Sequence, residues 1–175
     1  MANCGSNINV PKQAIKISTD EMKKNRRKIF DALMNSGLPK MNANYAAVVC
    51  GNIYGESGYN QHNVNPSSGA YGICQWLYYT RVAGLKDYAK QCNKPISDLD
   101  LQINYMIKEL KEGKTWGELT KLTGDDIINK GVNLFCNSFE NPGVNQCKSD
   151  NAKRTRAAKK ALEAHNSKND NVDLE

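Results

Sequence analysis

The chain has 175 residues, with 24 lysines and arginines against 18 aspartates and glutamates, so its formal net charge is +6. Hydrophobic residues make up 39% of the sequence and charged residues 24%, which is typical of a folded domain and excludes a disordered tail. The length predicts one domain, and no apolar run is long enough to span a membrane. The first residues contain no apolar segment typical of a secretory signal, so none is expected.

Helical signals begin at Ser18, and the segment before it is expected to be a weakly structured lead-in over residues 1–17. A capping Ser or Thr, acids in the first turn, apolar residues at helical spacing and a Gly and Pro stop signal predict a helix over residues 19–36. An asparagine cap then predicts a second helix that ends near Gly58. Its apolar pattern places Glu56 on the last turn of a mostly buried helix.

Residues 59–75 have no helical period and are rich in Gly, Asn, Ser and Pro, which predicts a loop with a short β-hairpin. Further helices are expected after it, with Ser97 as the cap of the second of them and a turn at Pro142 and Gly143. We therefore expect an α+β domain over residues 18–167, mainly α-helical with one small β-hairpin, and a short tail over 168–175. The further helices are predicted over 77–91, 97–112, 115–121, 125–139 and, strongly basic, 150–166.

Six cysteines form an even set, but six cysteines allow fifteen pairings and no CxxC spacing is present. A structural zinc site is therefore not expected. Each thiol is interpreted as a small buried hydrophobe, because free cysteine is among the most buried residue types. The cysteines are Cys4, Cys50, Cys74, Cys92, Cys136 and Cys147.

Glu56 is the candidate for acid catalysis. A carboxylic acid donates a proton near neutral pH only where its surroundings disfavour the charged form, as apolar and aromatic neighbours do. Tyr54 and Tyr59 flank Glu56 and the apolar helix lies behind it. The alternative for a glutamate near a helix end is a solvated surface position.

Three separated motifs place the chain near a known family. The segments VVCGNIYGESGYN, GAYGICQW with Arg81 shortly after it, and FENPG at 139–143 resemble the phage tail lysozyme family of cell-wall hydrolases. The resemblance covers roughly residues 42–163. It implies a lysozyme-like fold and cleavage of the β-1,4 bond between N-acetylmuramic acid and N-acetylglucosamine in peptidoglycan. It also implies a place in a virion tail, with other tail proteins as partners, or outside the cell at the wall.

The same resemblance implies roles for individual residues. Glu56 corresponds to the general acid and Ser57 to its small polar neighbour. Gln75 and Trp76 correspond to the pair that holds the sugars, and Tyr71 to an aromatic that lines the acetamido side. No metal and no cofactor are expected. The substrate-binding set comprises Ser57, Asn65, Ser68, Tyr71, Gln75, Trp76 and Glu140.

Glu56 has no acidic partner in the segment that follows it, although glycosidases usually employ two carboxylates. The next acid along the chain is Asp87, and position 65 is an asparagine. Two mechanisms fit a single acid. In the first, a hydrolytic water is placed by neutral groups such as Asn65, Ser67 or Ser68, or the 2-acetamido group assists. In the second, the muramic hydroxyl attacks, as in a lytic transglycosylase. A third alternative is that Glu140 reaches the cleft from far along the chain.

Two other classes of function stay open at this point. Cys74 with His62 or His165 is a candidate for a stem-peptide amidase. The positive charge near the C-terminus favours a non-catalytic module that binds anionic wall polymers, although such a run is usually a solvated helix face. No nucleic-acid motif accompanies it. The run contains Lys148, Lys153, Arg154, Arg156, Lys159 and Lys160.

Overall fold

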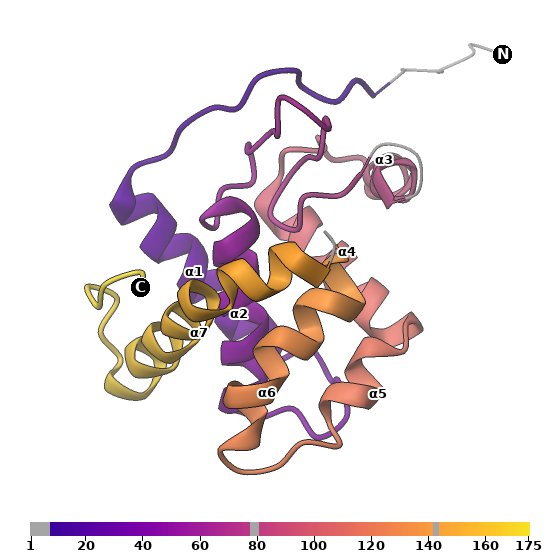
Figure 1. The fold of residues 1–175 in the computed structure, drawn as a ribbon. Helices are drawn as coiled ribbons and strands as arrows, with labels where there is room; N and C mark the ends of the chain where they lie inside the picture. The colour runs from indigo at the N-terminus through magenta and orange to yellow at the C-terminus, as the bar shows by residue number, and fades with distance from the viewer. Residues whose placement is uncertain (1–7, 78–80, 142–143) are drawn as a thin grey trace, which may run out of the picture.

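The computed structural model describes residues 8–77, 81–141 and 144–175 of the chain (Figure 1). Helices account for most of it, so the expectation of a mainly helical domain is confirmed. The elements are α1 (Thr19–Met34), α2 (Ala43–Ser57), α3 (Arg81–Cys92), α4 (Leu99–Glu112), α5 (Thr115–Leu119), α6 (Asp126–Phe135), the π-helical turn η1 (Cys136–Glu140) and α7 (Val144–Ser167).

Helix α2 is the central element, and it packs against α1, α6 and α7 (Figure 1). Every residue from Tyr45 to Ile53 is buried, so the helix has no solvent-facing stripe over that length. A helix that is apolar on all sides is stable only inside a protein, with other helices around it. Its final turn leaves the core, and Glu56 lies on that turn.

Local capping sets the limits of α2, as its sequence predicts. The Asn42 side chain accepts hydrogen bonds from the backbone N–H groups of Asn44 and Tyr45 at the start. At the other end Gly58 adopts a left-handed conformation, with φ of 62°, and its N–H donates to the Tyr54 carbonyl. A glycine is suited to this position because it has no Cβ to clash.

Several predicted boundaries differ from those observed. Helix α4 is capped by Asp98, not Ser97, and the Asp98 carboxylate accepts from the Leu101 N–H at 2.8 Å. The helix predicted over 125–139 is α6 followed by η1, and α7 begins at Val144, well before residue 150. The polar first turns of α7 carry no apolar signal from which its start could be predicted. Two predicted features fall largely on positions 78–80 and 142–143, outside the described residues. They are the start of α3 at 77–80 and the turn at Pro142 and Gly143.

The predicted β-hairpin is not found in the described part of the chain. Two isolated antiparallel bridges, Val64 with Tyr71 and Tyr71 with Trp76, occupy its place. A regular ladder needs extended backbone, but Gly72 and Gln75 have φ of 83° and 49°. These left-handed residues turn the chain too often for two strands to pair over any length.

Buried polar side chains hold this loop in place. The Gln102 side chain of α4 accepts from the Ile73 N–H at 3.0 Å and donates to the Gln61 carbonyl at 3.0 Å. From α1, the Asn25 amide donates to the Tyr59 carbonyl at 2.8 Å. Because buried backbone groups must be paired, these side chains replace the missing ladder and give the loop one conformation.

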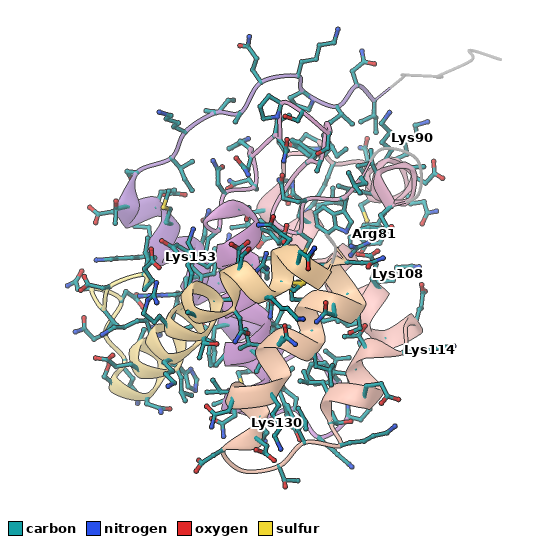
Figure 2. All side chains as sticks on the ribbon, viewed as in Figure 1. Arg81, Lys90, Lys108, Lys114, Lys130 and Lys153 are labelled. Carbon is teal, nitrogen blue, oxygen red and sulfur yellow. A yellow bond between two sulfur atoms is a disulfide. The ribbon has the colours of Figure 1, made fainter. Side chains whose placement is uncertain are left out.

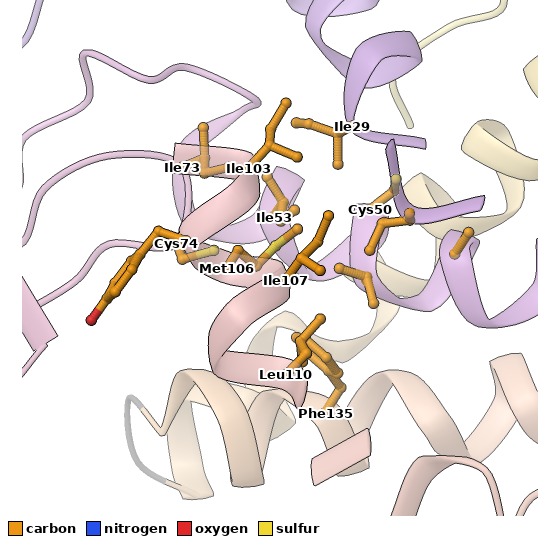
Figure 3. Packing of buried hydrophobic residues seen from close by; sticks show 14 of the residues in the cluster. Ile29, Cys50, Ile53, Ile73, Cys74, Ile103, Met106, Ile107, Leu110 and Phe135 are labelled. Atoms are coloured by element: carbon orange, nitrogen blue, oxygen red, sulfur yellow. The ribbon is translucent and has the colours of Figure 1, made fainter. Parts of the chain in front are cut away.

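The core extends between α2 and the later helices. Figure 3 shows Ile53 of α2 beside Met106, Ile107 and Leu110 of α4, with Phe135 of α6 below them. The C-terminal segment adds to the fold, because the buried Arg26 guanidinium donates to the backbone carbonyls of Asp170, Val172 and Asp173. None of the helices within the described ranges is long and apolar enough to cross a membrane.

Two glycines let α7 approach α2 closely. A Cβ on Gly51 would lie 2.7 Å from the Cβ of Ala158 and would also meet the Arg154 backbone carbonyl. A Cβ on Gly55 would lie 2.7 Å from the Arg154 guanidinium carbon. Both positions therefore need glycine for space, and the backbone of α2 lies directly against α7.

Replacing Gly51 by alanine tests this crossing. We expect Gly51→Ala to lower the free energy of unfolding by about 1–3 kcal/mol, because a methyl group in a filled contact forces the helices apart. Urea denaturation measures the change. Gly117→Ala is the matched control, since a Cβ there meets nothing within 4 Å. Equal stability of the Gly51→Ala and wild-type proteins would contradict the proposed close packing.

Candidate active site

A cleft of about 410 Å³ opens where the end of α2 meets the following loop, η1 and the first turns of α7. Three carboxylates, Glu56, Glu140 and Asp150, share this cleft with Arg154. They come from three different elements, so only the folded chain brings them together. Its lining also contains Gly55, Asn65, Ser68, Ala70, Gln75, Leu77 and Gln146.

A larger hollow of about 610 Å³ lies among α1, α3 and α4, with Tyr88 and Lys108 in its lining. Its only lining acid, Glu112, is exposed and forms an ion pair with Lys108 at 2.6 Å. A solvated acid that is already neutralised offers little for proton transfer. The smaller cleft is therefore the candidate active site.

Glu56 forms an ion pair with Arg154 of α7, in which Arg154 Nη2 lies 2.6 Å from Glu56 Oε1. The Arg154 side chain is only 2% exposed, while that of Glu56 is 12% exposed and faces the cleft. Arg154 Nη1 also donates to the Asn52 carbonyl and side-chain oxygens at 3.1 and 3.3 Å. Asp150 Oδ2 lies 3.8 Å from the same Nη2. Arg154 thus joins an accessible glutamate to an accessible aspartate.

Glu140 is the least solvated acid of the cleft. It ends the π-helical turn η1, and both its carboxylate oxygens are enclosed without a hydrogen-bond partner. Burial raises the pKa of Glu140 well above the usual range, and the Glu56 charge raises it further, whereas Arg81 and Arg154 act in the opposite direction. An enclosed, unpaired carboxylate is costly, so the neutral acid is the favoured form.

An ion pair on the other side of the cleft positions η1. Arg81 at the start of α3 makes two hydrogen bonds of 2.8 Å to the carboxylate of Glu109. Its Nη1 donates to the Phe139 carbonyl at 3.1 Å, and its guanidinium lies 4.5 Å from the centre of the Phe139 ring. Glu109 also accepts from Trp76 Nε1 at 2.7 Å. This network connects the loop to the residue that precedes Glu140.

The family model for phage tail lysozymes matches residues 24–164, which is most of the chain. The chain belongs to the phage tail lysozyme family. Membership indicates a lysozyme-like function on peptidoglycan and a place in a virion or outside the cell. No curated protein and no solved structure matches the chain significantly.

Four residues of the expected substrate-binding set line the cleft. They are Asn65, Ser68, Gln75 and Glu140. The Asn65 side-chain oxygen also accepts from the Ser68 N–H at 3.3 Å, so it shapes its own turn. Ser57 is buried instead, and its hydroxyl donates to the Ile53 and Ile73 carbonyls. Ser57 therefore fixes the loop to α2 rather than facing the cleft.

Tyr71 and Trp76 are placed in the core of this phage tail lysozyme. Both side chains are fully buried, and neither lines the cleft. The Trp76 ring lies 5.5 Å from the Tyr105 ring, and its N–H is occupied by Glu109. In this conformation neither ring is open to a sugar, and both support the loop from behind.

Cys74 lacks the surroundings of a nucleophile. Its side chain is buried, and burial raises the pKa of the thiol well above its usual value. A reactive cysteine needs an accessible, stabilised thiolate. His165 stacks on the ring of Phe30 at 4.4 Å, beside α1 and away from the loop. The geometry therefore does not favour the amidase alternative.

The basic run near the C-terminus contains a cleft residue that sequence reasoning missed. Arg154 was expected on a solvated face, but it is buried behind Glu56. The glycine pair in α2 is the signal that could have indicated a buried partner. Figure 2 shows the labelled lysines spread over several elements, with Lys90 on α3, Lys108 on α4, Lys130 on α6 and Lys153 on α7. Among the described residues, no group of three or more potential ligands is arranged to hold a metal ion.

The cysteines differ from one another in the fold. Cys136 of η1 and Cys147 of α7 form a disulfide, which corrects their interpretation as free buried thiols. Cys50 and Cys74 are buried as expected, whereas Cys92 is exposed. Cys4 lies outside the described residues. The disulfide joins the turn that carries Glu140 to the helix that carries Arg154.

Removing this disulfide is expected to destabilise the domain. Loop-closure entropy for a sequence separation of 11 predicts that Cys136→Ala/Cys147→Ala lowers the free energy of unfolding by about 3 kcal/mol. Urea denaturation of the double variant under non-reducing conditions measures it. Cys92→Ala, which removes an exposed free thiol, is the control and should leave stability unchanged. A double variant as stable as wild type would show that the disulfide does not form in solution.

Proposed function

We propose that the protein cleaves the β-1,4 bond between N-acetylmuramic acid and N-acetylglucosamine in peptidoglycan, with Glu56 as the general acid. The observation that carries this proposal is the position of Glu56 at the mouth of the cleft, at the end of a buried helix. It is the glutamate whose carboxylate is both partly desolvated and open to a ligand. In this position Glu56 can donate a proton to a glycosidic oxygen of a bound glycan.

The remaining lining suits a sugar. Asn65 and Ser68 offer amide and hydroxyl groups for the hydroxyl and acetamido substituents of a glycan. The Gln75 Nε2 donates to the Asn63 and Gly72 carbonyls, so this residue offers its side-chain oxygen as an acceptor. Leu77 also lines the cleft and is 48% exposed, so its side chain offers an apolar surface to the C–H face of a sugar ring. We assign substrate binding to these residues in place of Tyr71 and Trp76.

Hydrolysis is the favoured reaction because α7 supplies a second accessible carboxylate. Asp150 is 30% exposed in its side chain and shares Arg154 Nη2 with Glu56. A charged carboxylate near the acid can orient a water or stabilise the positive charge that develops at the anomeric carbon. Asp150 was absent from the sequence-based set because it lies far from Glu56 along the chain.

A lytic transglycosylase is the second candidate. The loop wall of the cleft, from Ser57 to Leu77, contains no acid at all. The substrate would therefore meet only neutral groups on this wall. The muramic hydroxyl would serve as the nucleophile, and this wall would supply no base. The two reactions leave different ends on the glycan, which makes them distinguishable by mass.

Mass spectrometry of soluble muropeptides released from purified peptidoglycan tests both the bond and the reaction. We expect products with reducible muramic ends. Anhydromuramic ends, lighter by one water, would identify a transglycosylase instead. Cut stem peptides, or no soluble product, would contradict glycan cleavage altogether.

Glu56→Gln tests the acid directly. The amide keeps the size of the side chain but donates no proton to a leaving oxygen, so we expect activity to fall by roughly a hundred- to ten-thousand-fold. Glu118→Gln, which changes an exposed glutamate on α5, is the matched control. A folded Glu56→Gln protein that cleaves glycan at the wild-type rate would rule out the assignment.

The groups that line the cleft favour glycan strands as the partner. Binding to anionic wall polymers and to other virion tail proteins is proposed on the net charge of +6 and on the family resemblance. Attraction of this electrostatic kind weakens as salt rises. Wall binding that is independent of ionic strength would argue against the polymer contribution.

A further inference from the structure

The proposed role of Glu56 poses a chemical problem. In the structure its carboxylate is paired with Arg154 at 2.6 Å, and an ion pair of this kind requires the charged form. A general acid must instead carry a proton when the substrate binds. A proton must therefore reach Glu56, and Arg154, which is 2% exposed, then keeps only the longer pair with Asp150 at 3.8 Å.

Glu140 and Arg154 have complementary unsatisfied groups. Both oxygens of Glu140 are enclosed and unpaired, and so is the Nε of Arg154. Both residues line the same cleft. A buried donor and a buried acceptor that each lack a partner are costly, and the charge of Arg154 lowers the pKa of Glu140, so it favours a charge on that carboxylate.

We propose that Glu140 is a positioning residue that holds a proton in the free protein and transfers it to Glu56 when glycan binds. The proton leaves one carboxylic acid and binds one carboxylate, so the site keeps one proton and its net charge throughout. Arg154 balances the negative charge on Glu56 before the transfer and on Glu140 after it. This inference rests on the proposed function of Glu56 and adds the origin of its proton.

The surroundings of Glu140 agree with this role. A buried carboxyl favours its neutral form, and a nearby carboxylate strengthens that preference. The neighbouring cations, in turn, make the charged form reachable. The titratable groups that act electrostatically on Glu140 are Glu56 of α2, Cys74 of the loop, Arg81 of α3, Glu109 of α4 and Arg154 of α7. Asp150 of α7 lines the same cleft.

Two variants are expected to move the pH profile of glycan cleavage in opposite directions. Activity at high pH is lost when the proton leaves the site. Glu140→Gln removes a negative charge, so the proton is held less tightly and this basic limb should move to lower pH by about one to three units. Arg154→Gln removes a positive charge, so the limb should move to higher pH. Purely structural damage would lower activity without opposite shifts.

Three outcomes for Glu140→Gln are distinguishable, with Glu118→Gln as the control. Activity that is lost at neutral pH and regained in acid supports the proposal. An unchanged basic limb overturns it. A folded variant that is inactive at every pH also overturns it, since Glu140 would then act on the substrate directly.

A titration measured without an activity assay separates this inference from the proposed function. It also tests the inference if the Arg154→Gln protein fails to fold. Carbon-13 NMR of the glutamate carboxyls should show Glu140 titrating above ordinary glutamates in the wild type, with its midpoint falling in Glu56→Gln. If wild type releases no muropeptides but these titrations hold, only the glycosidase function fails. If the wild type cleaves glycan but Glu140 titrates at the pH of an ordinary glutamate, and Glu56→Gln does not change that midpoint, only the proton-transfer proposal fails.

Discussion

The burial of Arg154 between α2 and α7 is the constraint on which the site depends. A guanidinium is always charged in proteins and loses most of its hydration at 2% exposure, so the fold must surround it with acceptors. Asn52 supplies two oxygens from the interior of α2, and Glu56 supplies a carboxylate from its last turn. Gly55 leaves the space that the guanidinium occupies. The position of Glu56 is thus set as much by α7 as by its own helix.

A second arginine, which is partly buried, holds the turn η1 in place. Arg81 is neutralised by Glu109 and donates to the backbone of η1, while the disulfide ties the same turn to α7. A π-helical turn is rare, and such turns are frequently found at functional sites. Here it ends in Glu140, whose carboxylate is held without a partner. The ion pair and the disulfide therefore hold the turn that carries this enclosed acid.

The sequence predicted what depends on near neighbours. The limits of α1 and α2 follow from caps and stop residues, and the depth of α2 follows from its apolar run, so Glu56 could be placed on a helix end. Arg154 and Asp150 could not be assigned to the cleft, because their partners lie in another helix nearly a hundred positions away. The hairpin was expected from turn residues, yet the same residues adopt left-handed conformations that prevent a ladder. Trp76 shows the same limit, since its indole N–H is committed to Glu109 of α4.

Accessibility and charge divide the three carboxylates of the cleft among different roles. Asp150 is the most exposed, and its carboxylate also accepts from the Gln146 side chain and lies 3.8 Å from Arg154 Nη2. Glu56 is partly enclosed, and its carboxylate is paired with Arg154. Both carboxylate oxygens of Glu140 are enclosed without a hydrogen bond, and burial favours its neutral form. When carboxylates with such different surroundings interact with one cation, binding of a proton by one carboxylate is linked to loss of a proton from another. A single arginine can therefore couple the acid that faces the substrate to an acid that the substrate does not touch.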